Sequence, residues 1–391
     1  MIKDTFYQTI SNILSGIILF LLIIILSRNL GVYEFGRYQL AVTIGTFAFL
    51  FLDGGFKNLI FREYTYPSDE IENILNQLFS TAILHLIICS IFLLSIVQFF
   101  KENILFSLAI IFYSLYVFCF FISSYLKAKG KFILDAYWNL FFKIMSVIFV
   151  ILISFFYKLN SEGVFILSIF GLFFCVFPVI LKNKNFSFNK FNITFYKFTY
   201  NFFLIDLFTQ IYFKSDILMV SYFKGYNENA IYTAASRIIE GIIFLISPLV
   251  FIYSQKLRKT DKKLPFFRNF FLLFMSISLI ITFIGMMSSK LIIRIFYGIS
   301  YINSALALKI LFIACFFMII NFMLTQSSIA FNKEKFYSRL TIICAFVNII
   351  LNFFLIPKFG ANGAAISTVV TEIILTIGML DNLSDIIHSL K

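Results

Sequence analysis

The sequence predicts an all-α integral membrane protein with about twelve transmembrane helices, and three observations support this fold class. First, 61% of the 391 residues are hydrophobic and 13% are charged, whereas soluble domains have about 45–50% apolar and about 25% charged residues. Second, the apolar residues fall into blocks that are long enough to cross a bilayer. Third, Lys and Arg gather in the short segments between these blocks.

Each apolar block is expected to form a helix, because lipid offers no hydrogen-bond partner to an open backbone. About 20 helical residues cross a hydrocarbon core of about 30 Å. The predicted spans are 8–27, 38–60, 78–100, 104–126, 136–156, 163–181, 199–222, 231–253, 266–288, 304–331, 337–356 and 362–380. The first block lacks a small-residue cleavage site, so we interpret it as a retained helix and not as a signal peptide.

The distribution of cations predicts the orientation of these spans. The N-terminus and alternate loops, among them 127–131, 182–197 and 256–268, hold most of the Lys and Arg residues. The positive-inside rule places this side, with both termini, in the cytoplasm. The net charge of +13 is therefore interpreted as a signal of topology, with contacts to membrane lipids and none to nucleic acid.

An internal repeat predicts two six-helix bundles, residues 1–190 and 191–391. At one constant shift, Gly31, Glu34, Tyr38, Ala41 and Ile44 fall on Gly225, Glu228, Tyr232, Ala235 and Ile238. At a similar shift, Lys158 and Gly163 fall on Lys358 and Gly363. Repeats of this kind are typical of transporters, which bind their substrates between the two halves.

Ionisable residues inside the spans are the first functional candidates, because each costs roughly 2.5–3.5 kcal/mol at mid-membrane. On the seventh span, Asp206, Gln210 and Lys214 share one helix face, and Asp216 lies near Lys214. Lys214 has no other acidic residue within four positions. This pattern favours a cation that faces a water-filled cavity.

Further candidates lie on four other spans. Lys143 on the fifth span has no acidic residue within four positions that could be its partner. Arg237 and Glu240 on the eighth span are three positions apart, so they either pair structurally or face the cavity. Amides and hydroxyls line one face of the first span and one face of the tenth: Gln8, Asn12, Ser15, Asn321 and Thr325.

The sequence contains no motif of an enzyme. It lacks a phosphate-binding loop, an HExxH zinc motif and a nucleophile elbow, and it contains only two His residues. The five Cys residues lie inside apolar blocks without metal-ligand spacing. We therefore expect no catalytic residue, no metal site and no cofactor other than a coupling ion, H⁺ or Na⁺.

Several motifs resemble those of Wzx-type polysaccharide flippases, which belong to the multidrug/oligosaccharidyl-lipid/polysaccharide (MOP) exporter superfamily. These motifs are SRNLGVYEFGRY at 27–38, DGGFKN at 53–58, DIL at 216–218, YTAA at 232–235, FYG at 296–298 and NIILN with IPKFGANGAA at 348–365. They follow one another along nearly the whole chain. The chain is short for the family, so no helix beyond the twelfth is expected.

The resemblance implies two bundles around a V-shaped central cavity in a bacterial inner membrane. It implies that undecaprenyl-pyrophosphate-linked sugar repeat units move from the inner to the outer leaflet, for O-antigen or capsule assembly. The pyrophosphate would bind Lys143, Lys214 and Arg237, and the sugar would bind the polar faces of the first and tenth spans and Gln210. Asp206, Asp216 and Glu240 would exchange the coupling ion in an antiporter. The protein would act as a monomer, with a polysaccharide polymerase as a candidate partner.

Other functions remain open at the level of sequence. A multidrug exporter of the same superfamily would favour an acidic or aromatic cavity, whereas the candidates here carry both signs of charge. A flippase for a teichoic acid or peptidoglycan precursor would share the lipid-linked substrate class. A third alternative is a membrane scaffold that does not transport, but a scaffold would not require charged residues that face a cavity.

Overall fold

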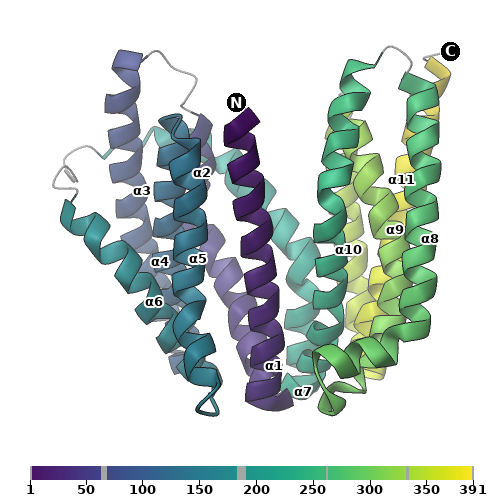
Figure 1. Cartoon of the computed structure of the whole chain (residues 1–391), viewed down its shortest axis with the longest axis horizontal. Helices are drawn as coiled ribbons and strands as arrows, with labels where there is room; N and C mark the ends of the chain where they lie inside the picture. Colours follow the sequence, from purple (N-terminus) through teal and green to yellow (C-terminus); the bar gives the residue numbers. More distant parts are fainter. Residues whose placement is uncertain (1, 63–67, 183–190, 261–262, 332–333, 390–391) are drawn as a thin grey trace. The chain divides into compact units, whose positions relative to one another are not determined.

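The computed structural model describes residues 2–62, 68–182, 191–260, 263–331 and 334–389, and these residues are almost entirely helical (Figure 1). The helices are α1 (Ile2–Asp53), α2 (Phe56–Arg62), α3 (Ser68–Val97), α4 (Asn103–Ala128), α5 (Phe132–Ser154), α6 (Ser161–Lys182), α7 (Phe195–Lys259), α8 (Lys263–Phe296), the 3-10 helix η3 (Ile299–Tyr301), α9 (Ser304–Ala330), α10 (Glu334–Phe359) and α11 (Ala361–Ser389). The described residues contain no strand. The predicted all-helical class is confirmed.

Within the described residues, ten helices are long and apolar enough to cross a membrane. Two of them are longer than a single membrane crossing requires, since α1 has 52 residues and α7 has 65. A straight helix of either length would be more than twice as long as the hydrocarbon core of about 30 Å is thick. Each of the two must therefore change direction.

Both long helices are broken at a single glycine. Gly31 in α1 has φ 76° and ψ 173°, and Gly225 in α7 has φ 81° and ψ −174°. A residue with a Cβ avoids this region, so glycine is the residue that permits the break. These two glycines are the pair that the internal repeat matched, and the same backbone geometry thus recurs in both halves of the sequence.

A glutamate three positions after each break forms the second repeated feature, because it accepts a hydrogen bond from the N-terminus of a later helix. Glu34 accepts hydrogen bonds from the Ser161 N–H (3.0 Å) and the Ser161 hydroxyl (2.7 Å) at the start of α6. Glu228 accepts a hydrogen bond from the Ala361 N–H (2.9 Å) at the start of α11. A carboxylate satisfies the open N–H groups of a helix N-terminus and complements its dipole. Glu34 and Glu228 therefore each accept a hydrogen bond at the start of a helix, α6 in one half of the sequence and α11 in the other.

The chain divides into two compact units, Met1–Gln210 (unit 1) and Ile211–Lys391 (unit 2). In unit 1, α1 packs on α4 and α5, and α4 and α5 pack on α6. In unit 2, α9 packs on α8 and α11, and α10 packs on α11. The predicted boundary at 190 adjoins segment 183–190, which lies outside the described residues, and the division between units falls within α7.

The predicted span 38–60 is not one helix. Helix α1 ends at Asp53 and α2 begins at Phe56, with two glycines of positive φ between them. The Asp53 carboxylate accepts hydrogen bonds from the backbone N–H groups of Gly55 (3.2 Å) and Lys57 (2.9 Å). Asp53 thus caps the start of α2, a role that the apolar pattern alone does not reveal.

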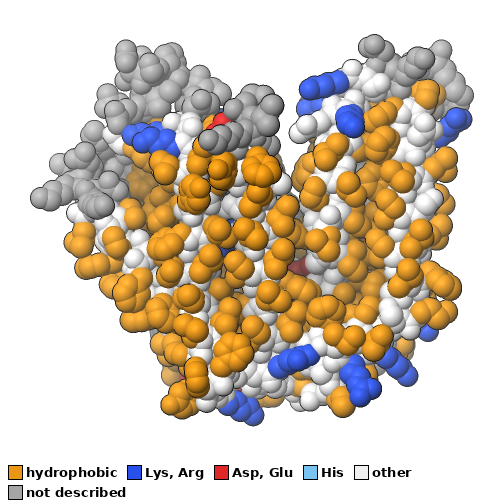
Figure 2. All heavy atoms as spheres, viewed as in Figure 1, with side chains coloured by type: hydrophobic (Ala, Val, Ile, Leu, Met, Phe, Trp, Pro, Cys, Tyr) orange, Lys and Arg blue, Asp and Glu red, His pale blue; other side chains and the backbone are white. Residues whose placement is uncertain are grey.

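The surface of each unit is strongly apolar. Figure 2 shows hydrophobic side chains along the length of the helices, with most of the visible Lys and Arg side chains near the helix ends. Exposed examples are Ile91 and Phe92 on α3 and Phe283 and Met287 on α8. Apolar patches of this extent are not stable in water, so they indicate a lipid environment.

Candidate functional site

Two cations and one carboxylate of unit 2 form a cluster that we call the cationic cluster. The Lys214 Nζ lies 3.0 Å from the Glu240 Oε1, and the Arg237 Nη1 lies 2.7 Å from the Glu240 Oε2. The Lys214 and Arg237 side chains are 14% and 16% exposed, whereas Glu240 is 44% exposed. One carboxylate thus contacts both cations, and Asp216 lies close enough to Lys214 to attract it electrostatically.

The cluster contains one contact that helix spacing allowed and one that it did not reveal. Arg237 and Glu240 pair across three positions, which is one of the two possibilities that the sequence left open. Lys214 has no acidic residue other than Asp216 within four positions, and its ion pair is with Glu240 further along the chain. The break at Gly225 brings Lys214 and Glu240 together, since they lie 26 positions apart on opposite sides of it in α7. Spacing rules for a straight helix could not reveal this contact.

Asp216 lies near Lys214 but beyond ion-pair distance of it, and its hydrogen-bond donors are neutral. It is buried, and its carboxylate accepts hydrogen bonds from the Tyr232 hydroxyl (2.6 Å), the Asn352 amide (2.7 Å) and the Thr368 hydroxyl (3.3 Å). Asn352 also donates to the Asn348 Oδ1 at 2.8 Å. No cation among the described residues forms an ion pair with Asp216. A buried carboxylate in this setting can be neutralised by a small cation.

A second buried carboxylate of unit 2 engages the predicted polar face of the tenth span. Glu372 accepts hydrogen bonds from the Tyr212 hydroxyl (2.8 Å) and the Asn321 amide (2.7 Å). The Asn321 Oδ1 in turn accepts from the Thr376 hydroxyl at 2.8 Å. Thr325, one turn further along α9, is half-buried. Asn321 therefore holds two helices together in this structure.

The other seventh-span candidates belong to unit 1. Asp206 forms an ion pair with Lys57 at 2.9 Å, and Lys57 also lies 3.8 Å from Asp53. Gln210 is half-buried, and its side-chain oxygen accepts no hydrogen bond from the described residues. Asp206 and Lys214 thus belong to different units, although the sequence places them on one helix face.

Lys143 lies on α5 of unit 1 and is half-buried. Its Nζ lies 5.9 Å from the centroid of the Phe142 ring. Within the described part of the chain, no carboxylate lies within ion-pair distance of it. The inference that Lys143 lacks an acidic partner is therefore consistent with these contacts.

The predicted polar face of the first span is divided between two environments. Gln8 donates hydrogen bonds to the Phe132 carbonyl (2.8 Å) and the Asp135 Oδ2 (2.6 Å) on α5. Ser15 is buried and donates to the Ser11 carbonyl of its own helix, whereas Asn12 is exposed. The three residues therefore do not share one surface.

The sequence reasoning missed a buried polar network around Asp135. This carboxylate is fully buried and accepts hydrogen bonds from Gln8, Ser123 and Asn139. The Lys127 Nζ lies 3.5 Å from its Oδ2. Asp135 and Asn139 are four positions apart, a usable signal, but the predicted span began at 136 and so omitted the acid.

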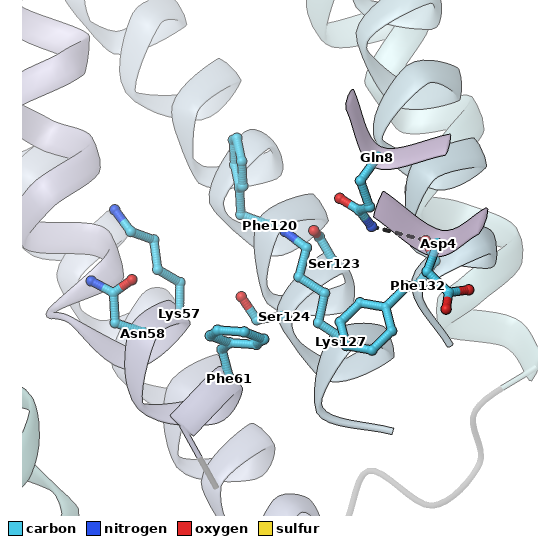
Figure 3. A pocket seen from close by; sticks show the side chains of 10 residues that line it. All are labelled: Asp4, Gln8, Lys57, Asn58, Phe61, Phe120, Ser123, Ser124, Lys127 and Phe132. Atoms are coloured by element: carbon cyan, nitrogen blue, oxygen red, sulfur yellow. Dashed lines mark hydrogen bonds between the residues drawn. The ribbon is translucent and has the colours of Figure 1, made fainter. Parts of the chain in front are cut away.

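A cavity of about 550 Å³ adjoins this network inside unit 1 (Figure 3). It opens between α1, α2, α4 and α5. Its lining residues are Asp4, Gln8, Lys57, Asn58, Phe61, Phe120, Ser123, Ser124, Lys127 and Phe132. We call it the unit 1 cavity.

Comparison with known structures identifies the fold. The lipid II flippase MurJ in an inward closed conformation superposes with a TM-score of 0.77, at 21% identity over 96% of this chain and 87% of that one. An inward-facing multidrug resistance MATE family transporter of the MOP superfamily gives 0.68, at 15% identity over 98% and 95%. At these identities the likeness establishes the fold, which is that of the MOP transporters.

The sequence comparison then identifies the family. Residues 1–253 match the family described as Polysaccharide biosynthesis protein, and the chain belongs to it. The chain is also 24% identical to the capsular polysaccharide biosynthesis protein CapF of Staphylococcus aureus, over 96% of this chain and 98% of CapF. An uncharacterized membrane protein of Methanocaldococcus jannaschii, MJ1068, is 26% identical over 58% of this chain and 49% of its own length.

These findings confirm the resemblance that the sequence motifs indicated. The protein is a multi-pass membrane protein of the polysaccharide biosynthesis family, and its fold is that of MOP transporters. The prediction that it is not an enzyme agrees with this family and this fold.

Proposed function

We propose that this protein is a flippase that moves undecaprenyl-pyrophosphate-linked sugar repeat units from the inner to the outer leaflet of a bacterial inner membrane. The product would enter capsule or O-antigen assembly. Membership of the polysaccharide biosynthesis family and similarity to CapF over nearly the full chain support this pathway. The substrate is a bulky lipid whose headgroup is anionic, and the protein must therefore offer cations within the membrane.

The cationic cluster is the observation on which the proposal rests. Lys214 and Arg237 are largely shielded from solvent and share the Glu240 carboxylate. Cations within an apolar protein are costly, so such a pair favours an anionic ligand for part of the cycle. A pyrophosphate fits this need, because it accepts charge-assisted hydrogen bonds from both cations. We propose Lys143 as a third contact.

The proposed topology has twelve crossings in two six-helix bundles, with a V-shaped cavity and with both termini in the cytoplasm. The breaks at Gly31 and Gly225 support it, since each divides an overlong helix into two segments of spanning length. The repeated contacts of Glu34 and Glu228 support a two-fold repeat.

We propose Asp216 as the group that couples transport to a cation gradient. Asp206 and Glu240 are already engaged in ion pairs, whereas Asp216 accepts hydrogen bonds from neutral donors only and forms no ion pair with the described residues. Binding of H⁺ would neutralise its charge directly. Na⁺ would find the oxygen ligands that hard cations prefer in the Asp216 carboxylate and in the Tyr232 and Thr368 hydroxyls.

Complementation of a flippase-deficient strain tests the proposed function. The Lys214→Ala variant is expected to abolish surface polysaccharide at an unchanged protein level, because the headgroup loses a cation in a low-dielectric site. Lys224→Ala is the matched control, since Lys224 lies on the same helix beside the Gly225 break and is exposed. Normal surface polysaccharide in the Lys214→Ala strain would contradict the proposal, as would resistance to drugs without polysaccharide export.

A further inference from the structure

We propose that the unit 1 cavity binds the phosphate group of a sugar phosphate, at a site separate from the cationic cluster. This inference rests on the proposed function in one respect, which is that the lipid-linked glycan is one source of the ligand. The cavity itself is formed by unit 1 alone. Its volume of about 550 Å³ lies within the range of about 300–1,000 Å³ that is usual for small-molecule sites.

The ammonium group of Lys127 supplies the charge for such a ligand. Asp135, its only ion-pair partner within the described chain, already accepts hydrogen bonds from Gln8, Ser123 and Asn139. The distance from the Lys127 Nζ to the carboxylate is 3.5 Å, which is long for a charge-assisted hydrogen bond. An ammonium has three donors, so Lys127 has donors available for an anion in the cavity.

Lys57, the second lysine in the cavity lining, already forms an ion pair with an acidic residue. The Lys57 Nζ lies 2.9 Å from the Asp206 carboxylate and 5.0 Å from the centroid of the Phe49 ring. Its charge is therefore largely balanced by its own ion pair. Lys127 is the cation that remains to meet a phosphate.

Neutral donors in the lining have unused hydrogen-bonding capacity. The Asn58 amide and the Ser124 hydroxyl line the cavity, and neither side chain forms a hydrogen bond with the described residues. Ser124 lies on α4 three positions before Lys127, so both face the same side of that helix. These groups can bind phosphate oxygens or sugar hydroxyls.

The apolar part of the lining favours a sugar phosphate over a bare phosphate. Phe61, Phe120 and Phe132 contribute rings from three different helices, as Figure 3 shows. Pockets that combine aromatic walls with a few convergent polar groups suit a ligand with both apolar and polar faces, as a sugar ring has. Inorganic phosphate would leave most of this surface unused.

Two sources could supply a sugar phosphate, and the experiment separates them. One is the lipid-linked glycan, whose first sugar is joined to its carrier through phosphate. The other is a soluble sugar phosphate. The cavity lies at the end of unit 1 that holds Asp4 and Gln8, near the N-terminus, which the predicted topology places in the cytoplasm.

The full-length protein in lipid nanodiscs offers a label-free titration, because Trp138 is its only tryptophan. The Trp138 indole N–H donates to the Cys119 carbonyl at 2.9 Å, beside the lining residue Phe120. Trp138 fluorescence is followed during titration with glucose 1-phosphate, with inorganic phosphate and with a short-chain prenyl-pyrophosphate disaccharide.

We expect the wild-type protein to bind at least one of the two sugar-containing probes more tightly than inorganic phosphate. Lys127→Gln should weaken this binding by roughly ten-fold or more, because a hydrogen bond to a charged group is lost. Lys127→Arg should retain binding. Lys129→Gln is the matched control, since Lys129 lies over the Tyr125 ring and outside the lining, and it should bind as the wild type does.

Three results would overturn the inference: no response to any sugar probe, equal binding by Lys127→Gln and the wild type, or equal loss in Lys127→Gln and Lys129→Gln. A Ser124→Ala variant that folds and binds weakly would support it even if Lys127→Gln fails to fold. The Lys214→Ala variant should bind glucose 1-phosphate normally, because Lys214 belongs to unit 2 and is not part of the cavity lining. If it loses polysaccharide export while Lys127→Gln binds normally, the proposed function stands and the cavity inference is wrong.

Discussion

At the scale of single residues, four acids within the apolar helices fall into two groups. Asp206 and Glu240 form ion pairs with Lys or Arg side chains. Asp216 and Glu372 accept hydrogen bonds from hydroxyl and amide groups, and the described residues provide no cation within ion-pair distance of either. An unpaired buried charge is costly, so acids of the second group are suited to take up a cation reversibly.

The first prediction concerns Asp216. Asp216→Asn preserves the size of the side chain and an oxygen acceptor for Tyr232, but it removes the charge that a coupling cation would neutralise. We expect the variant to fold and to lose the dependence of transport on a H⁺ or Na⁺ gradient. Reconstituted vesicles with an imposed gradient provide the measurement. If the variant responds to both gradients as the wild type does, Asp216 is not the coupling group.

The second prediction concerns Asp135. Asp135→Ala removes the acceptor of the Gln8, Ser123 and Asn139 side chains and the ion pair of Lys127. Because each buried donor left without a partner costs about 1–3 kcal/mol, we expect a loss of roughly 3 kcal/mol or more in stability.

Thermal unfolding in detergent measures this loss as a lower midpoint temperature. Asp135→Asn is the milder control, since it keeps one acceptor oxygen in the network. An unchanged midpoint for Asp135→Ala would show that water replaces the lost acceptor and that the network contributes little to stability.

At the scale of helices, the two halves of the chain share a device for reversing direction. Gly31 and Gly225 adopt nearly the same φ and ψ, and each is followed three positions later by a glutamate that contacts the start of a later helix. The two halves therefore match in sequence, in backbone geometry and in tertiary contacts. The break at Gly225 also forms part of the candidate site, because it allows Lys214 to contact Glu240.

The third prediction tests this device. A Cβ added at Gly31 or Gly225 would meet no atom within 4 Å, so any effect comes from the backbone and not from crowding. Since positive φ with extended ψ costs a non-glycine residue about 1–3 kcal/mol, Gly31→Ala and Gly225→Ala should each lower stability by that amount. Equal midpoints for both variants and the wild type in thermal unfolding would show that the breaks relax without strain.

At the scale of the whole molecule, the sequence predicted what depends on local pattern and missed what depends on tertiary contact. Hydropathy and the absence of soluble segments predicted the helical class, and the motifs predicted the family. The repeat pointed to Gly31 and Gly225 before their geometry was known. The sequence did not predict the Lys214–Glu240 and Lys57–Asp206 pairs, because each joins residues far apart in the chain.

The candidate site shows the same limit. The pairing of Arg237 with Glu240 follows a helix-spacing rule and was one of two possibilities that the sequence offered, whereas the neutral partners of Asp216 come from three separate segments. Gln8, Asn12 and Ser15 have helical spacing but different surroundings, because a helix face 100° wide meets more than one neighbour.

The most direct test of the account is a flipping assay with purified protein. A fluorescent prenyl-pyrophosphate oligosaccharide is placed in both leaflets of proteoliposomes, and the fraction that becomes accessible to an external reagent is followed with time. We predict that the wild type and Lys224→Ala equilibrate the lipid between the leaflets, and that Lys214→Ala and Arg237→Ala do so at least ten-fold more slowly, in line with the loss of a charge-assisted contact. Equal rates for the wild type and both cluster variants would contradict the claim that this cluster carries an anionic headgroup across the membrane.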